Sequence, residues 1–143
     1  MLAIPADLEN WLRLFSKAVR GRDFSAGRAL FDGAVTAFGT VCSRAESLDE
    51  LVSCQWQAVR PQTTGFDFDY VTARAMTAVD WATVIAGWRS TGFANGGKPV
   101  ERLGRATLVL HKSAAGWKAV HTHFSINPQS SDHDPVLRHA RPC

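Results

Sequence analysis

The clearest alternation of apolar and polar residues lies in the last third of the chain. Residues 105–112 are rich in Thr, Leu and Val, and residues 117–126 are rich in β-branched and aromatic side chains. The four residues between them end at Gly116, and glycine tolerates the positive φ of a tight turn. The pattern predicts two antiparallel strands joined by a hairpin.

The two faces of this hairpin differ in character, because successive side chains of a strand point to opposite sides. If His111 lies opposite Trp117 in the hairpin, one face of the hairpin is apolar, and this face is predicted to pack against helices. The other face is both polar and aromatic, which suits a subunit interface. We predict that it forms the dimer face of the protein, through Arg105, Thr107, Val109, Trp117, His121 and His123.

Three helices are predicted upstream of the sheet. Over residues 5–21, apolar side chains recur at the spacing of an amphipathic helix: Trp11, Leu14, Phe15, Ala18 and Val19. A short helix is predicted over residues 23–31. Ser47 and Glu50 have the spacing of a capping box, which predicts a third helix that ends at about Arg60, before a proline.

Further strands are predicted by alternation between these helices and the final hairpin. Residues 34–42 form the first strand, residues 66–72 alternate aromatic with acidic side chains, and residues 79–91 form a long strand. Asn95-Gly96-Gly97-Lys98 predicts a hairpin turn before a strand over residues 101–112. The element order is therefore helix, helix, strand, helix and then four antiparallel strands.

This order predicts an α+β fold, in which a strongly curved antiparallel sheet carries three N-terminal helices on its concave face. A bent sheet closed by helices makes a cone, and a cone encloses a pocket. Residues 1–128 are expected to form a single domain. Residues 129–143 contain three prolines and little periodicity, so they are expected to be an arm or a disordered end.

Composition agrees with one globular domain. Of the 143 residues, 45% are hydrophobic and 20% are charged. The net charge is +3, but the basic residues are scattered, so no nucleic-acid partner is predicted. Apolar runs fall short of the ~20 residues of a membrane span. No membrane association is predicted, and the start of the chain lacks the features of a signal peptide.

Three cysteines occur, at positions 42, 54 and 143. Their number is odd and they lack C-x-x-C spacing, which favours reduced thiols in a cytoplasmic protein. Cys42 and Cys54 are predicted to fill the core.

Polar residues offer several candidate chemistries. His121 and His123 share a strand face, where they could form a metal pair, an acid–base pair, or interface and structural hydrogen bonds. Asp67 and Asp69 also share a face. They could be a pair of carboxylates that act as acid and base, or they could lie on a solvated strand edge. Residues 132–134, Asp-His-Asp, resemble a ligand cluster, but nothing fixes their geometry. We predict no metal and no cofactor.

The aromatic residues are the last candidate for a functional site. They form either a plain hydrophobic core or the wall of a ligand pocket. We predict a pocket for a flat, mostly apolar ligand, with Tyr70, Thr122 or Arg89 supplying polarity. The predicted pocket residues are Trp11, Phe15, Trp56, Phe68, Tyr70, Trp88, Leu108, Thr122 and Phe124.

Six segments carry a family resemblance: Phe31-Asp32, Phe38–Val41, Leu48–Trp56, Trp88–Gly92, Gly104–Leu110 and Gly116–Ser125. Through these segments the chain resembles the NTF2-like, or SnoaL-like, superfamily over about residues 8–128. This superfamily includes ketosteroid isomerase, scytalone dehydratase and the association domain of calcium/calmodulin-dependent protein kinase II. The most specific segment is Gly-Trp-Lys-x-Val-His-x-His-x-Ser at residues 116–125. The resemblance implies a cone-shaped pocket and dimerisation through the convex sheet face.

Two departures from this superfamily bear on function. Ketosteroid isomerase-like enzymes place a catalytic carboxylate near the end of the first strand, and residues 36–40 contain no acid here. The pocket arginines of the kinase association domain fall at Trp88, Leu108 and Phe124. The resemblance therefore implies an apolar, aromatic pocket in which a carboxylate ligand meets no charge partner.

These observations predict a homodimeric small-molecule binding protein, or a metal-independent enzyme, with a pocket for a hydrophobic cyclic ligand. The alternative is a non-catalytic assembly module like the kinase association domain. An open, partly polar cavity favours the first function. A filled cone with an extensive second interface favours the alternative.

Overall fold

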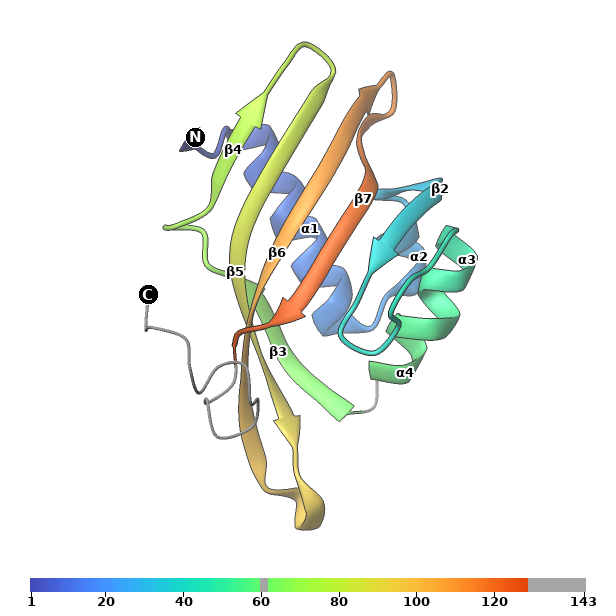
Figure 1. Cartoon of the computed structure of the whole chain (residues 1–143), viewed down its shortest axis with the longest axis vertical. Coiled ribbons are helices and arrows are strands. Elements are labelled where there is room, and N and C mark those ends of the chain that lie inside the picture. The colour runs from blue at the N-terminus through green and yellow to red at the C-terminus, as the bar shows by residue number, and fades with distance from the viewer. Residues whose placement is uncertain (60–61, 129–143) are drawn as a thin grey trace, which may run out of the picture.

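The computed structural model describes residues 1–59 and 62–128, which form one curved sheet packed against helices (Figure 1). The helices are α1 (Ala6–Gly21), α2 (Phe24–Arg28), α3 (Leu48–Leu51) and α4 (Gln57–Val59). The sheet has seven strands, in the order β1 (Leu2–Ala3), β4 (Arg74–Thr77), β5 (Trp81–Phe93), β6 (Pro99–Ser113), β7 (Gly116–Ile126) and β2 (Phe31–Phe38), with β3 (Thr63–Phe68) paired to β5.

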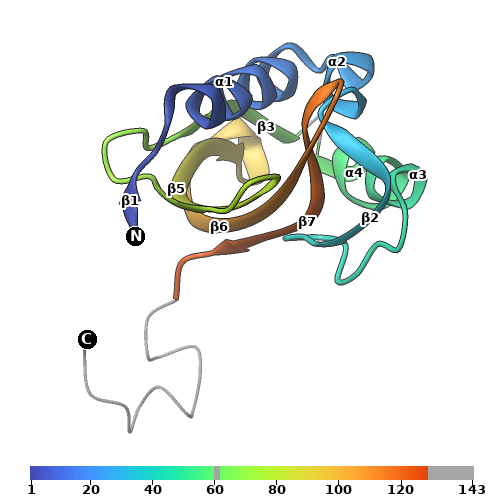
Figure 2. The same ribbon diagram turned by 90° about the horizontal axis from the view of Figure 1, so that it is seen from above.

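The sheet curves around α1, which lies across its concave side (Figure 2). This arrangement confirms the predicted α+β cone. Within the described residues, no helix is both long enough and apolar enough to cross a membrane. The other side of the sheet carries no helix in Figure 2, so it is the convex face of the cone.

Helix α1 packs on the sheet through one apolar side. Leu8, Trp11, Leu12 and Phe15 are buried there, while Leu14 is 46% exposed and points to solvent. The predicted stripe is corrected at this residue, because Leu12 and not Leu14 lies on the buried side. Helix α1 ends at Gly21, and the next residue takes the left-handed conformation that closes a helix.

The third helical segment begins at the predicted cap. The Ser47 hydroxyl accepts the Glu50 N–H at 3.2 Å, and the Glu50 carboxylate accepts the Glu46 N–H at 2.8 Å. A π-helical turn over Val52–Trp56 joins α3 to α4, a feature that no pattern in the sequence indicates. The predicted end of this helix at residues 60–61 and the predicted tail at 129–143 lie outside the described residues.

The sheet is mixed, which corrects the prediction of a purely antiparallel sheet. Strand β2 runs parallel to β7, with Phe31 opposite Ala119 and Phe38 opposite His123. Alternation identifies a strand but does not identify its neighbour, because it depends on local backbone geometry alone. The short strands β1 and β4 escaped prediction, because two and four residues are too few to show alternation.

A bulge in the final hairpin changes the predicted faces. Val109 pairs with His121 and Leu110 pairs with Ala119, so Val120 has no partner on β6. The extra residue reverses the alternation on its turn side. Trp117 therefore lies on the helix-covered face, where its indole N–H donates to Asp7 at 2.8 Å. This placement corrects its assignment to the dimer face.

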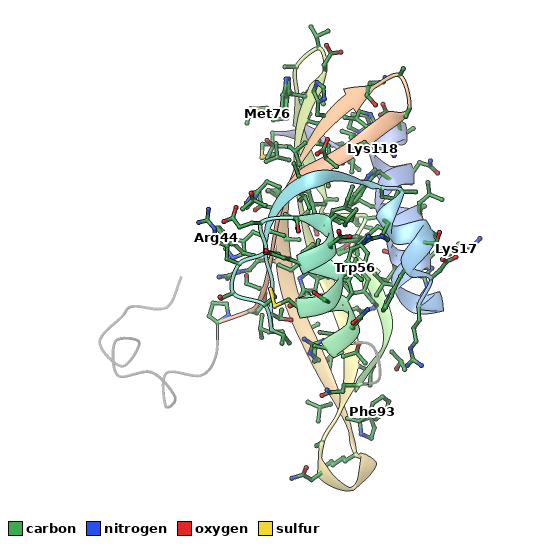
Figure 3. All side chains as sticks on the ribbon, turned by 90° about the vertical axis from the view of Figure 1, so that its right-hand side faces the viewer. Lys17, Arg44, Trp56, Met76, Phe93 and Lys118 are labelled. Carbon is green, nitrogen blue, oxygen red and sulfur yellow. A yellow bond between two sulfur atoms is a disulfide. The ribbon has the colours of Figure 1, made fainter. Side chains whose placement is uncertain are left out.

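The cysteines provide a further correction. Cys42 and Cys54 form a disulfide, with their Cα atoms 5.3 Å apart. The bond joins the loop after β2 to the π-helical turn, and it is the yellow bond in Figure 3. Folding brings these thiols together although they are separated by 12 residues, so their spacing in the sequence did not reveal the pair.

Candidate ligand-binding site

A cavity of about 130 Å³ lies between the helices and the concave face of the sheet. Its walls come from α1, α2, the helical segment 48–59 and the strands that face them. A single water molecule needs roughly 10–15 Å³ of such space. The cavity is therefore large enough for several water molecules or for part of a small organic ligand.

The structure brings five of the nine predicted pocket residues to this cavity: Phe15, Trp56, Trp88, Thr122 and Phe124. Trp56 reaches from the helical segment toward α2 (Figure 3), where its ring lies 3.1 Å from the position that a Cβ would take at Gly27. The other four predicted residues, Trp11, Phe68, Tyr70 and Leu108, do not line the cavity.

The inner wall of the cavity is aromatic. Phe15 lies at its centre, with ring centroids 5.5 Å from Trp11, 6.2 Å from Trp56 and 5.9 Å from Phe124. Such contacts add to the burial energy of the rings. Part of the predicted pocket is therefore solid core, and the open space begins beyond this cluster.

Trp88 is fixed in the wall by its backbone neighbours. Its indole N–H donates to the Arg105 carbonyl at 3.1 Å. A Cβ at the paired residue Gly104 would lie 2.2 Å from the Trp88 ring. Only the absence of a side chain at Gly104 admits this ring, so the wall position of Trp88 is set by a glycine on the neighbouring strand.

The structure also places a cation in the wall, which the sequence analysis missed. Arg102 lines the cavity and is half-buried. Its guanidinium group donates to the Ser90 hydroxyl at 3.1 Å and lies 5.6 Å from the centre of the Trp88 ring. Desolvation lowers the pKa of Arg102. These facts correct the expectation that a carboxylate would meet no charge partner in the pocket.

A signal for Arg102 was present in the alternation of the sequence. Side chains two residues apart in a strand lie on the same face. Arg102 therefore shares the buried face of β6 with Gly104, Ala106, Leu108 and Leu110. The resemblance to the kinase association domain pointed instead to Trp88, Leu108 and Phe124, which carry no charge.

Two other arginines border the cavity, and both have partners. Arg20 lies 3.5 Å from the Asp67 carboxylate and donates to the Phe66 carbonyl at 3.0 Å. Arg22 donates to the Thr63 carbonyl at 3.4 Å. Of the described residues that line the cavity, Asp23 is the only acid. Its carboxylate accepts the Ala26 N–H at 3.0 Å and so caps α2.

Gln55 organises the loop at the edge of the cavity. Its side-chain oxygen accepts the N–H groups of Val41 and Cys42, both at 2.8 Å, and its amide donates to the Thr40 hydroxyl at 2.8 Å. The Cys42–Cys54 disulfide ties the same loop to the same turn. Thr40 and Gln55 both line the cavity, so these bonds fix part of its rim.

Asp67 on β3 and Asp69, which follows the end of β3, do not divide into an acid and a base. Burial raises the pKa of Asp67, but hydrogen bonds from Tyr70 and from the Phe68 N–H, with the Arg20 charge, outweigh burial and lower it. The hydrogen bond from Thr72 lowers the pKa of Asp69. A general acid needs a raised pKa, so the interpretation as an acid–base pair is corrected.

The two histidines lie on the convex face, away from the cavity. Their rings contact the Phe38 ring, at centroid distances of 5.2 Å for His121 and 5.3 Å for His123. Nδ1 of His121 is 2.6 Å from the Thr36 carbonyl oxygen, which fits a structural hydrogen bond. In the part of the chain that the structure describes, no three His, Cys, Asp or Glu side chains are grouped as a metal site. The Asp-His-Asp segment at 132–134 lies outside that part.

Solved structures with the same architecture define the class of fold. An NTF2-like protein from Salmonella enterica serovar Typhimurium superposes with a TM-score of 0.74 at 14% identity, covering 86% of this chain and 90% of the other. A ketosteroid isomerase-like protein from Erwinia carotovora atroseptica gives 0.72 at 20% identity, covering 87% and 96%. The protein therefore has the NTF2-like fold.

A candidate calcium/calmodulin-dependent protein kinase II association domain from Xanthomonas campestris shares this fold, with a TM-score of 0.68 at 18% identity, covering 85% of this chain and 84% of the other. Residues 8–128 match the model of the SnoaL-like domain family. The chain belongs to this family. No curated protein matches it significantly.

Proposed function

We propose that the protein binds a hydrophobic cyclic small molecule in its aromatic cavity, as a binding protein or as a metal-independent enzyme. The observation that carries this proposal is an open, partly polar cavity of about 130 Å³ inside the cone of a SnoaL-like chain. Ligand sites are usually concave and mostly apolar, with a few polar groups that fix orientation.

The side chains of the wall suit a flat ligand. The rings of Trp88 and Phe124 offer apolar surface from two different strands, β5 and β7. Thr122 and Ser90 are almost fully buried and add hydroxyl groups to the same wall. A ring system can therefore stack on the aromatic side chains while its polar substituents meet the hydroxyl groups.

The wall bears on the choice between binding and catalysis. The one carboxylate among the described lining residues, that of Asp23, already caps α2. Proton abstraction next to a carbonyl needs a free base within reach of the substrate. The described wall therefore supports ligand binding more directly than isomerisation by a carboxylate base.

A thermal-shift and fluorescence screen tests the proposal. The purified protein is screened against steroids, aromatic polyketides, neutral cyclic ketones and hydrophobic carboxylates, beside Trp88→Ala and Leu14→Ala variants. Leu14 is 46% exposed and does not line the cavity, so its variant is the control. We expect a ligand to raise the melting temperature of the parent and of Leu14→Ala, but not of Trp88→Ala. A folded parent that binds none of these classes would contradict the proposal.

The convex face concerns self-association, which both candidate functions share. We infer that two copies associate there as a homodimer. Five of the predicted dimer residues lie on the convex face of β6 and β7, opposite the buried face: Arg105, Thr107, Val109, His121 and His123. The same side of β5 and β6 exposes large apolar side chains, and exposed apolar patches mark interaction sites: Trp81, Ile85, Phe93 and Leu103.

The cytoplasmic location predicted from the sequence remains a prediction. Its thiol argument no longer holds, because Cys42 and Cys54 form a disulfide. Structural disulfides persist mainly in oxidising compartments. Localisation of a tagged full-length chain in its native cell would decide between a cytoplasmic and an oxidising compartment.

A further inference from the structure

Arg102 is the polar group that the proposed function leaves unexplained. Among the described residues no carboxylate lies within ion-pair distance of it, whereas Arg20 has Asp67. Arginine carries five N–H donors, and one of them donates to Ser90. A half-buried guanidinium group without a counter-charge is costly unless an anion binds it. The position therefore suits an anionic ligand.

The fold holds Arg102 in place before any ligand arrives. Its side chain passes over Gly92 of β5, where an added Cβ would lie 3.0 Å from the Arg102 Cδ atom. Its guanidinium group then reaches the Trp88 ring and the Ser90 hydroxyl. A cation–π contact and a hydrogen bond thus restrict the side chain from two sides, which lowers the ordering cost of binding.

The surroundings of Arg102 are cationic. Arg22 donates to the Thr63 carbonyl, and Thr63 pairs with Gly92, so both arginines reach the same end of the cavity. Asp23, the acid of the described lining, is engaged by the N-terminus of α2. An anion entering at this end meets uncompensated positive charge close to aromatic surface.

We propose that Arg102 binds the carboxylate group of a ligand whose aromatic or cyclic body lies against Trp88 and Phe124. The planar fork of a guanidinium group matches a carboxylate through two parallel hydrogen bonds. The inference rests on the proposed function, since it names the ligand class of the same cavity. It specifies hydrophobic carboxylates over neutral ring compounds.

Matched ligand pairs test this inference. Benzoate and benzamide, then 2-naphthoate and 2-naphthamide, are titrated calorimetrically into the full chain at neutral pH. We expect the parent to bind each carboxylate about tenfold more tightly than its amide, the ratio that one charge-assisted hydrogen bond supplies. Arg102→Gln should remove this preference, because it weakens carboxylate binding much more than amide binding. Lys17→Gln makes the same charge change at an exposed site on α1 and should keep the preference.

A second variant displaces Arg102 without removing its charge. Gly92 does not have a positive φ, so its backbone accepts alanine, but the new Cβ would crowd the Arg102 side chain. Gly92→Ala should reduce the preference for carboxylates. Gly33→Ala in β2 is the control, because nothing lies within 4 Å of a Cβ there. Circular dichroism and melting temperature establish that each variant is folded.

The outcomes separate this inference from the proposed function. If the parent binds amides and carboxylates equally, or if Arg102→Gln keeps the preference, the role of Arg102 is overturned while the aromatic cavity stands. If the folded parent binds no compound of either kind, the inference about Arg102 is overturned, and the screen of the wider ligand classes decides the proposed function. Loss of the preference in Arg102→Gln with retained amide binding supports both.

Discussion

At the scale of single residues, the cavity depends on positions whose role is not evident from residue type. Gly104 makes room for Trp88, and Gly92 makes room for Arg102. Each glycine lies on the strand next to the residue it accommodates, with Gly104 directly opposite Trp88 in the sheet. Substitution at these glycines should therefore change the cavity wall although neither glycine presents a side chain to it.

Asp67 gives a prediction about pH. Its pKa in the folded protein lies below the ordinary value, because its hydrogen bonds and the Arg20 charge outweigh burial. A lowered folded pKa stabilises the protein above the unfolded pKa of about 3.9, and this contribution is lost as pH falls through the folded pKa. We expect Asp67→Asn to cost about 1 kcal/mol at pH 7, and this cost should shrink as pH falls below about 4.

Urea unfolding from pH 7 down to pH 3 measures this difference, with Glu101→Gln as an exposed carboxylate control. A cost that stays constant over the whole range would show that Asp67 acts through packing and not through its charge.

At the scale of elements, the loop after β2 is held to the helical segment by two independent devices. Gln55 accepts two backbone N–H groups of the loop, and the disulfide joins Cys42 to Cys54. Both devices act on the π-helical turn over Val52–Trp56. This connection fixes the rim of the cavity relative to the sheet.

We expect loss of the disulfide to destabilise the protein. The bond spans 12 residues, and closing a loop of that size in the unfolded chain contributes about 3 kcal/mol. Cys54→Ser should lower the melting temperature accordingly, as measured by scanning calorimetry. Reducing agent should lower the melting temperature of the parent and leave that of Cys54→Ser unchanged. Equal sensitivity of both proteins to the reducing agent would show that this bond does not form in solution.

At the scale of the whole molecule, the proposed homodimer is expected to form through the convex face. Leu103 on this face and Leu14 on α1 are similarly exposed, at 45% and 46%. We expect Leu103→Glu to convert a homodimer into a monomer, because it places a charge inside the apolar patch. Leu14→Glu should leave the dimer intact. Multi-angle light scattering measures both masses, and a parent that is monomeric at every concentration tested would rule out the dimer.

The architecture of the whole molecule was accessible from the sequence to a considerable degree. The helix cap at Ser47, the amphipathic pattern of α1 and the alternation of β5 to β7 predicted an α+β cone. Part of the site was accessible in the same way, since Phe15, Trp56, Trp88, Thr122 and Phe124 line the cavity. These residues were found because a buried face follows from the period of its own element.

The sequence by itself determined what local backbone geometry controls: where the cap of the third helix lies, where the long strands lie, and which side chains share a face within an uninterrupted strand. Only the tertiary structure decided that β2 runs parallel to β7, that the bulge at Val120 turns Trp117 inward, and that Cys42 meets Cys54. It also decided that Arg102 stands in the cavity wall with no carboxylate of the described residues within ion-pair distance. Each of these features depends on distant segments meeting in space, and periodicity along one element carries no information about that meeting.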